Sequence, residues 1–207
     1  KNNIKNNMWD NLGRNIGEFA FVNKLNPYNN QSLNSYKKKP RFIIEGQQYI
    51  EDICNMKTGA IFFSAHIGNW EICPLILTGK KLKVTSIYRH ANNPFNEKII
   101  QWLRKGISFY APKGPSGAKK LFKVLRNKEF AAILADQKLN EGMLIDFLGH
   151  PAKTATAIGE LSLKLSIPLV PIHVQRIKGA TFKYIIEKPI MIPKNTYNHD
   201  KELLILL

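Results

Sequence analysis

A histidine and a glutamate, His66 and Glu71, closely follow the apolar run Ala60 to Ala65. Gly68 and Asn69 lie between them and favour a tight bend into a helix, for which asparagine is a suitable N-cap. Glu71 would then lie in the first helical turn, where the helix dipole favours an ionised carboxylate. That carboxylate can accept a hydrogen bond from one nitrogen of the His66 ring and leave the other nitrogen as a base. The pattern predicts a general base with an orienting carboxylate.

The same segment carries no marked nucleophile. Ser64 lies close to His66, but no Gly-x-Ser-x-Gly motif surrounds it. If His66 activates a hydroxyl, that hydroxyl belongs to the substrate, and a group passes to it directly without a covalent intermediate. A structural histidine at a strand end is the alternative that the spacing leaves open. No second ligand three or four residues from His66 indicates zinc, and we expect neither a metal nor a cofactor.

Three further polar residues, Arg89, Lys113 and Asp136, each follow a run that is typical of a strand. Functional groups of α/β folds gather at the carboxyl ends of strands, so we expect a site there. Arg89 and Lys113 suit a substrate phosphate or an oxyanion; a structural ion pair and a solvated loop position are the respective alternatives. Asp136 is expected to hold loop backbone or to pair with a basic neighbour. Asn69 is either a helix cap or a substrate ligand.

Strand and helix patterns alternate after residue 41, which predicts an α/β fold with a mixed, largely parallel central sheet flanked by helices in a single domain. We expect an N-terminal helical arm and loop over 1–40, the α/β domain over 41–193, and the start of a truncated C-terminal helix over 194–207. The periodicities predict helices over 8–21, 43–56, 70–77, 95–105, 117–126 and 156–165, and strands over 60–65, 83–89, 107–112, 130–136, 168–176 and 182–188.

The chain of 207 residues has a formal net charge of +16, which predicts attraction to anionic surfaces such as phospholipids, nucleic acid or an acidic protein. We do not expect nucleic acid as the partner, because no arginine-rich helix, zinc-finger spacing or aromatic RNA-binding motif is present. No apolar run reaches the length of about 18 residues that spans a bilayer.

Together, six segments resemble the late acyltransferases of lipid A biosynthesis, the lauroyl/myristoyl transferases of Gram-negative bacteria. They come in the family's order and spacing over roughly residues 8 to 193. The segments are SAHIGNWE, YRHANNP, PKGPSGAKKL, LADQK, IDFLGHPAKTATA and PLVPIHVQRIKGA.

The resemblance implies an α/β acyltransferase with an H-x4-[DE] motif, in which His66 is the catalytic base and Glu71 its orienting carboxylate. It implies transfer of a fatty acyl chain from acyl carrier protein to a hydroxyl of an anionic lipid A precursor, at the cytoplasmic face of the inner membrane. Family members begin with an apolar membrane helix and continue further at the C-terminus, so we expect the protein to extend beyond both ends of this chain. The alternatives are another glycerolipid or glycolipid acceptor, or an inactive truncated copy that binds membrane or nucleic acid through its charge.

Overall fold

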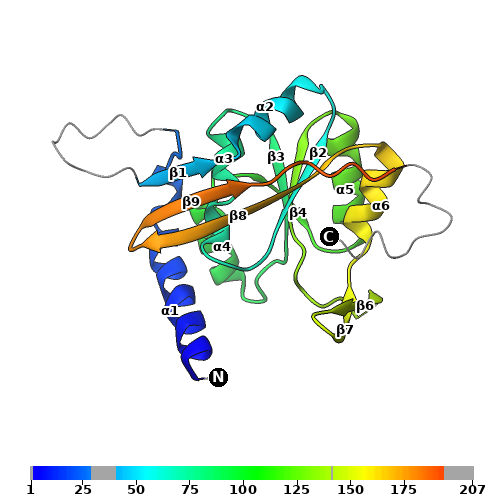
Figure 1. Ribbon diagram of the computed structural model, residues 1–207. Helices are drawn as coiled ribbons and strands as arrows, with labels where there is room; N and C mark the ends of the chain where they lie inside the picture. Colours follow the sequence, from blue (N-terminus) through cyan, green and yellow to red (C-terminus); the bar gives the residue numbers. More distant parts are fainter. Residues whose placement is uncertain (1, 29–40, 141, 194–207) are drawn as a thin grey trace.

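The computed structural model describes residues 2–28, 41–140 and 142–193. Its centre is a seven-stranded sheet in the order β1-β9-β8-β2-β5-β3-β4 (Figure 1). Neighbouring strands pair in parallel except β8 and β9, so the predicted mixed, largely parallel sheet is confirmed. The strands are Phe42–Glu45 (β1), Ala60–Ser64 (β2), Val84–Tyr88 (β3), Phe109–Pro112 (β4), Phe130–Leu134 (β5), Leu169–Lys178 (β8) and Thr181–Ile186 (β9), with Met143–Phe147 (β6) and His150–Thr154 (β7) in a separate hairpin.

The two middle strands, β2 and β5, are apolar along nearly their whole length because both faces of the sheet are covered. Successive side chains of a strand point to opposite faces. Phe62 therefore packs in one hydrophobic cluster and its neighbour Ile61 in another. The core is thus divided into two layers by the sheet.

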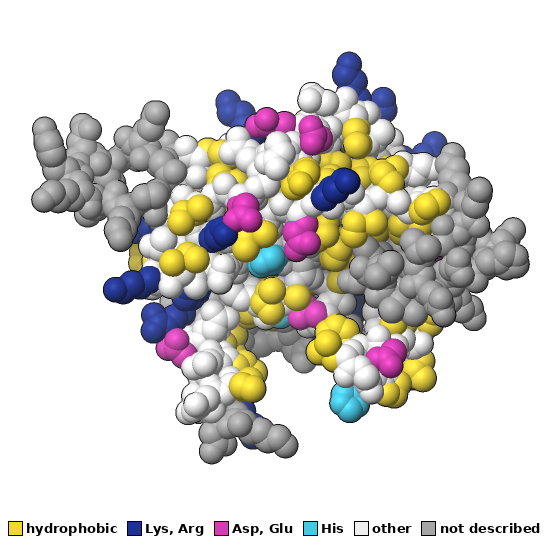
Figure 2. Space-filling view, viewed as in Figure 1, with side chains coloured by type: hydrophobic (Ala, Val, Ile, Leu, Met, Phe, Trp, Pro, Cys, Tyr) yellow, Lys and Arg dark blue, Asp and Glu magenta, His cyan; other side chains and the backbone are white. Residues whose placement is uncertain are grey.

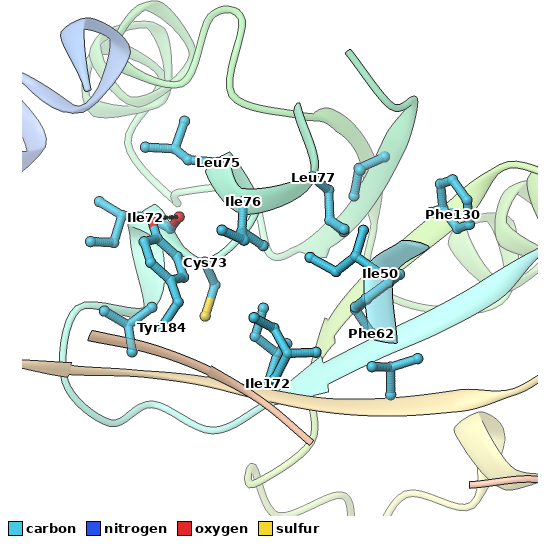
Figure 3. Close-up of a cluster of buried hydrophobic side chains, with 14 of the residues drawn as sticks. Ile50, Phe62, Ile72, Cys73, Leu75, Ile76, Leu77, Phe130, Ile172 and Tyr184 are labelled. Carbon is cyan, nitrogen blue, oxygen red and sulfur yellow. Dashed lines mark hydrogen bonds between the residues drawn. The ribbon is translucent and has the colours of Figure 1, made fainter. Parts of the chain in front are cut away.

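Helices supply the other side of each layer. Ile50 of α2 and Ile76 of α3 pack with Phe62 in the first cluster, whereas Leu121 of α5 and Ile158 of α6 pack with Ile61 in the second. Figure 3 shows the first cluster, where the buried Tyr184 hydroxyl donates a hydrogen bond of 2.9 Å to the carbonyl of Ile72. The helices are Asn2–Phe19 (α1), Gln47–Asn55 (α2), Leu75–Thr78 (α3), Pro94–Leu103 (α4), Pro115–Arg126 (α5) and Ala157–Leu165 (α6), with 3-10 turns at Val22–Lys24 (η1) and Trp70–Ile72 (η2).

The bounds predicted for two of the helices were partly wrong. The helix expected from residue 43 begins only at Gln47, because residues 42–45 form the edge strand β1 beside β9. Gly46 separates the two elements with a φ of 80°, and a Cβ there would collide with the carbonyl of Ile186. The helix expected over 70–77 is divided into η2 and α3, with Pro74 at the N-cap of the second.

The predicted amphipathic helix of the N-terminal arm is confirmed as α1, which begins earlier than expected. Its C-terminal half contacts the body of the protein, while Ile4, Met8, Trp9 and Ile16 on its surface are exposed. Within the described ranges, no helix has the length and apolar character needed to cross a membrane. The predicted helix over 194–207 lies outside the described residues.

Candidate active site

The carboxyl ends of four neighbouring parallel strands form one edge of the sheet. His66 follows β2, Asp136 follows β5, Arg89 follows β3 and Lys113 follows β4. The four polar residues that the sequence placed after strands therefore follow strands that lie side by side. This edge is the candidate active site.

His66 and Asp136 are in direct contact across β2 and β5. The Nδ1 atom of His66 lies 2.7 Å from Oδ1 of Asp136, and the backbone N–H of His66 donates to Oδ2 at 2.8 Å. An ionised carboxylate only accepts hydrogen bonds, so Nδ1 of His66 carries a proton and donates it to Asp136. Partial burial would raise the pKa of Asp136, but the hydrogen bonds from the His66 backbone and ring outweigh it and lower that pKa below the ordinary 3.8. The contact leaves Nε2 as the ring nitrogen that is available to act as a base.

Glu71 does not have the contact that the sequence predicted for it. Its carboxylate accepts two hydrogen bonds from Arg104, at 2.6 Å from Nη2 and 3.2 Å from Nε. The orienting carboxylate of His66 is Asp136, so the predicted His66–Glu71 hydrogen bond was wrong. A carboxylate 70 positions away in the sequence reaches the ring because β2 and β5 are neighbours, whereas Glu71 turns toward α4.

Arg104 was missed by the sequence analysis. It ends α4, and both Arg104 and Glu71 are largely buried, with 16% and 17% of their side chains exposed. The guanidinium lies 4.9 Å from the ring centroid of Tyr88 and 5.4 Å from that of Tyr110, which suits cation–π contacts. The only available signal was an arginine four residues after Ile100 on the apolar face of a predicted helix. The ion pair holds the turn after His66 against α4.

We expect Glu71→Gln to lower the free energy of unfolding by about 3 kcal/mol, because it leaves the buried Arg104 charge uncompensated. The double variant Glu71→Gln/Arg104→Met should recover at least half of that loss, since no unpaired charge remains. Urea unfolding followed by circular dichroism measures both. Unchanged stability of Glu71→Gln together with lost activity would restore the role that the sequence predicted for Glu71.

The loop between His66 and Trp70 is fastened to α1. The carbonyl of Gly68 accepts hydrogen bonds of 2.8 Å from the side chains of Asn11 and Asn15. Gly68 has a φ of 55°, and a Cβ there would collide with the carbonyl of Val174, so the position needs glycine. The N-terminal arm is therefore part of the scaffold of the site.

Asn69 completes this attachment. Its side chain is fully buried and donates a hydrogen bond of 2.7 Å to Glu18 of α1, which is itself paired with Arg176 of β8. Asn69 occupies the N-cap position of η2, as predicted, but its side chain makes no capping hydrogen bond. Asn69 therefore ties the loop to α1, which neither prediction included, and its role as a substrate ligand stays a prediction.

Arg89 and Lys113 are exposed at the same edge. No hydrogen bond or ion pair joins either side chain to another residue in the described part of the chain, so the predicted structural ion pair of Arg89 is absent there. The loop that carries Arg89 is ordered by Glu97, which accepts hydrogen bonds from the Tyr88 hydroxyl and from the backbone N–H of Ala91. Both cations are free to contact a ligand.

A mostly apolar pocket opens beside the loop after His66. Trp70 lines it and also contacts His66, with the two ring centroids 5.2 Å apart. The walls reach into the core and include Phe62, Leu77, Ala132, Leu134 and Ile172, with Glu71 and Arg104 among the few polar residues. The pocket suits an apolar chain next to the base.

This arrangement defines a class of protein. An α/β sheet with a carboxylate-oriented imidazole beside an apolar pocket suits an O-acyltransferase. The chain belongs to the bacterial lipid A biosynthesis acyltransferase family, whose sequence profile matches residues 1–202. The resemblance noted in the sequence is thereby confirmed.

The chain also has two curated relatives that are named as acyltransferases of another lipid. The chain is similar to the phosphatidylinositol mannoside acyltransferase of Mycobacterium tuberculosis, from strains CDC 1551 / Oshkosh and ATCC 25618 / H37Rv. The identity is 22% over 137 residues, which cover 63% of this chain and 43% of the relative in both cases. The chain thus spans less than half the length of the curated relatives it matches.

Proposed function

We propose that this chain transfers a fatty acyl group from acyl carrier protein to a hydroxyl of a lipid A precursor, at the cytoplasmic face of the inner membrane. The observation that carries the proposal is the 2.7 Å contact between His66 Nδ1 and Asp136 beside the apolar pocket. Family membership supports the reaction class and the lipid acceptor.

In the proposed reaction, Nε2 of His66 takes the proton of the acceptor hydroxyl. The hydroxyl oxygen attacks the thioester carbonyl, the carbon–sulfur bond breaks, and the carrier thiolate leaves with the proton from the imidazolium. The acyl chain occupies the apolar pocket. Arg89 and Lys113, both exposed, are the proposed contacts to the phosphates of an anionic acceptor or to the developing oxyanion.

Direct transfer is favoured over an acyl-enzyme because the nearby nucleophiles are poorly activated. Among the described residues, no serine, threonine or cysteine side chain hydrogen-bonds to the ring of His66. The Cys73 thiol lies 3.8 Å from the Ser64 hydroxyl instead, and burial raises the pKa of that thiol to about 12. A thiol with this pKa stays protonated near neutral pH and is a weak nucleophile.

The second candidate is transfer to another glycolipid, which is supported by the similarity to an acyltransferase of phosphatidylinositol mannoside. Acceptor exchange distinguishes the two. We expect radiolabelled acyl chains from acyl carrier protein to appear on a lipid A precursor, and not on phosphatidylinositol mannoside presented in the same detergent. Labelling of the mannoside alone would overturn the lipid A assignment while keeping the transferase, and labelling of neither would contradict the proposed activity.

A further inference from the structure

The hairpin that follows β5 has a tight turn at its tip. Strands β6 and β7 pair antiparallel, and Phe147 faces His150 across the turn residues Leu148 and Gly149. Both turn residues have positive φ, 54° and 78°, and the Gly149 N–H donates to the side chain of Asp146 at 2.8 Å. Two successive residues with positive φ define a turn that favours Asn-Gly or Gly-Gly.

Leucine at position 148 has an unfavourable backbone conformation, and burial of its side chain does not offset this cost. The left-handed conformation is strained for a branched apolar side chain, and asparagine or glycine would relieve that strain. Leu148 is nevertheless 85% exposed, and its neighbours Leu144 and Phe147 are 64% and 66% exposed. Only Ile145 of β6 turns into the fold. Three large apolar side chains at the tip are thus unused by the folded chain itself.

The tip is one of three apolar projections around the candidate active site. The hairpin follows the carboxyl end of β5, α4 follows that of β3, and α1 is bonded to the loop after β2. Trp9 of α1 and Trp102 of α4 are 63% and 66% exposed. In Figure 1 α1 and the hairpin project from the same side of the body, and Figure 2 shows hydrophobic side chains on both.

Exposed lysines accompany these apolar groups. Lys138 and Lys153 lie in the hairpin region, and Lys98 and Lys105 lie on and after α4. Exposed apolar side chains with lysines on the same or neighbouring segments are typical of surfaces that lie on anionic lipid. The net charge of +16 on the whole chain likewise favours contact with an anionic surface.

We propose that the hairpin tip, Leu144, Phe147 and Leu148, inserts into the surface of an anionic phospholipid bilayer. This inference rests on the proposed function, because a lipid acceptor must reach His66 from the membrane. The hairpin, α1 and α4 then contact the bilayer around the carboxyl edge of the sheet and hold the site over its substrate.

The test is Leu148→Asn, since asparagine suits the turn and removes the apolar contact. We expect its unfolding temperature to equal or exceed that of the parent chain. Its affinity for vesicles of phosphatidylethanolamine and phosphatidylglycerol in equal parts, measured by co-sedimentation, should fall about ten-fold. Met56→Asn is the matched control, because Met56 is also exposed but lies before β2, at the opposite edge of the sheet; it should bind like the parent.

The outcomes separate this inference from the proposed function. Parent-like vesicle binding by Leu148→Asn would overturn the role of the hairpin and leave acyl transfer untouched. Unchanged vesicle binding together with lost transfer from acyl carrier protein would also overturn it, since the tip would then contact the carrier. Weakened binding to vesicles with full transfer to a detergent-dispersed acceptor supports it. A parent chain that binds vesicles but transfers nothing contradicts the proposed function alone.

Discussion

Replacing His66 by alanine should lower the rate of acyl transfer by about 10²–10⁴-fold, the usual contribution of a general base. The ring is held against Asp136 through Nδ1, and its Nε2 is the proposed acceptor of the hydroxyl proton. The loss should appear in kcat, because the substitution removes no apolar wall of the pocket. Steady-state transfer with a saturating acceptor measures it.

His173→Ala is the matched control for this variant. His173 lies in β8 and its ring is 3.8 Å from Glu187, away from the contacts of the proposed base. It should transfer at the parent rate. If His66→Ala and His173→Ala show equal rates near that of the parent, His66 is a structural histidine and the proposed mechanism is wrong.

Asp136→Asn should have an effect of comparable size, about 10²-fold or more. The amide cannot accept from both the backbone N–H and the ring N–H of His66 through two equivalent oxygens, so the tautomer with a free Nε2 is no longer enforced. The corresponding change in a Ser-His-Asp triad lowers kcat about 10⁴-fold. Asp52→Asn on the exposed surface of α2 is the control, and it should change neither rate nor stability.

The stability of the parent relative to Asp136→Asn should also depend on pH. The pKa of Asp136 is lowered by folding, so its contribution to stability is fully present above the ordinary 3.8 and is lost as the pH falls through the folded value. The difference in unfolding free energy between the parent and Asp136→Asn should therefore narrow when the pH is lowered from about 6 to about 3. A difference that stays constant over this range would mean that the carboxylate is not held by His66.

Local sequence patterns were sufficient for most of the secondary structure. The strands β2 and β5 are short apolar runs between turn residues, and each was predicted within two residues of its ends. The edge strand β1 was missed because its two isoleucines fit a helix equally well, and only its pairing with β9 decides between them. The hairpin of β6 and β7 was missed because its exposed apolar residues break the alternation of a half-buried strand.

The sequence predicted which strand ends carry the site, but it did not predict which side chains contact one another there. His66 and Asp136 were both singled out, yet the carboxylate nearest in sequence, Glu71, was assigned to the ring. Contacts between neighbouring strands join residues far apart in the chain, and strand order cannot be read from a single strand. The pairing of Glu71 with Arg104 depends likewise on where α4 packs.

The role of α1 could not be predicted from its amphipathic pattern. Its asparagines looked like part of a polar surface, but Asn11 and Asn15 bond to the carbonyl of Gly68 and hold the loop after His66. A helix whose polar face is the packed face, while much of its apolar face is exposed, reverses the usual expectation. The exposed apolar residues of α1 agree with the lipid surface proposed for the hairpin.

The central claim is that His66 activates the acceptor hydroxyl for direct transfer. Intact-protein mass spectrometry after incubation with acyl carrier protein that carries the donor, first without and then with a lipid A precursor, tests it most directly. We predict that the protein mass stays unchanged in the first step and that acylated lipid forms in the second. An increase of the protein mass by one acyl group in the first step, lost when the acceptor is added, would show an acyl-enzyme and contradict the account.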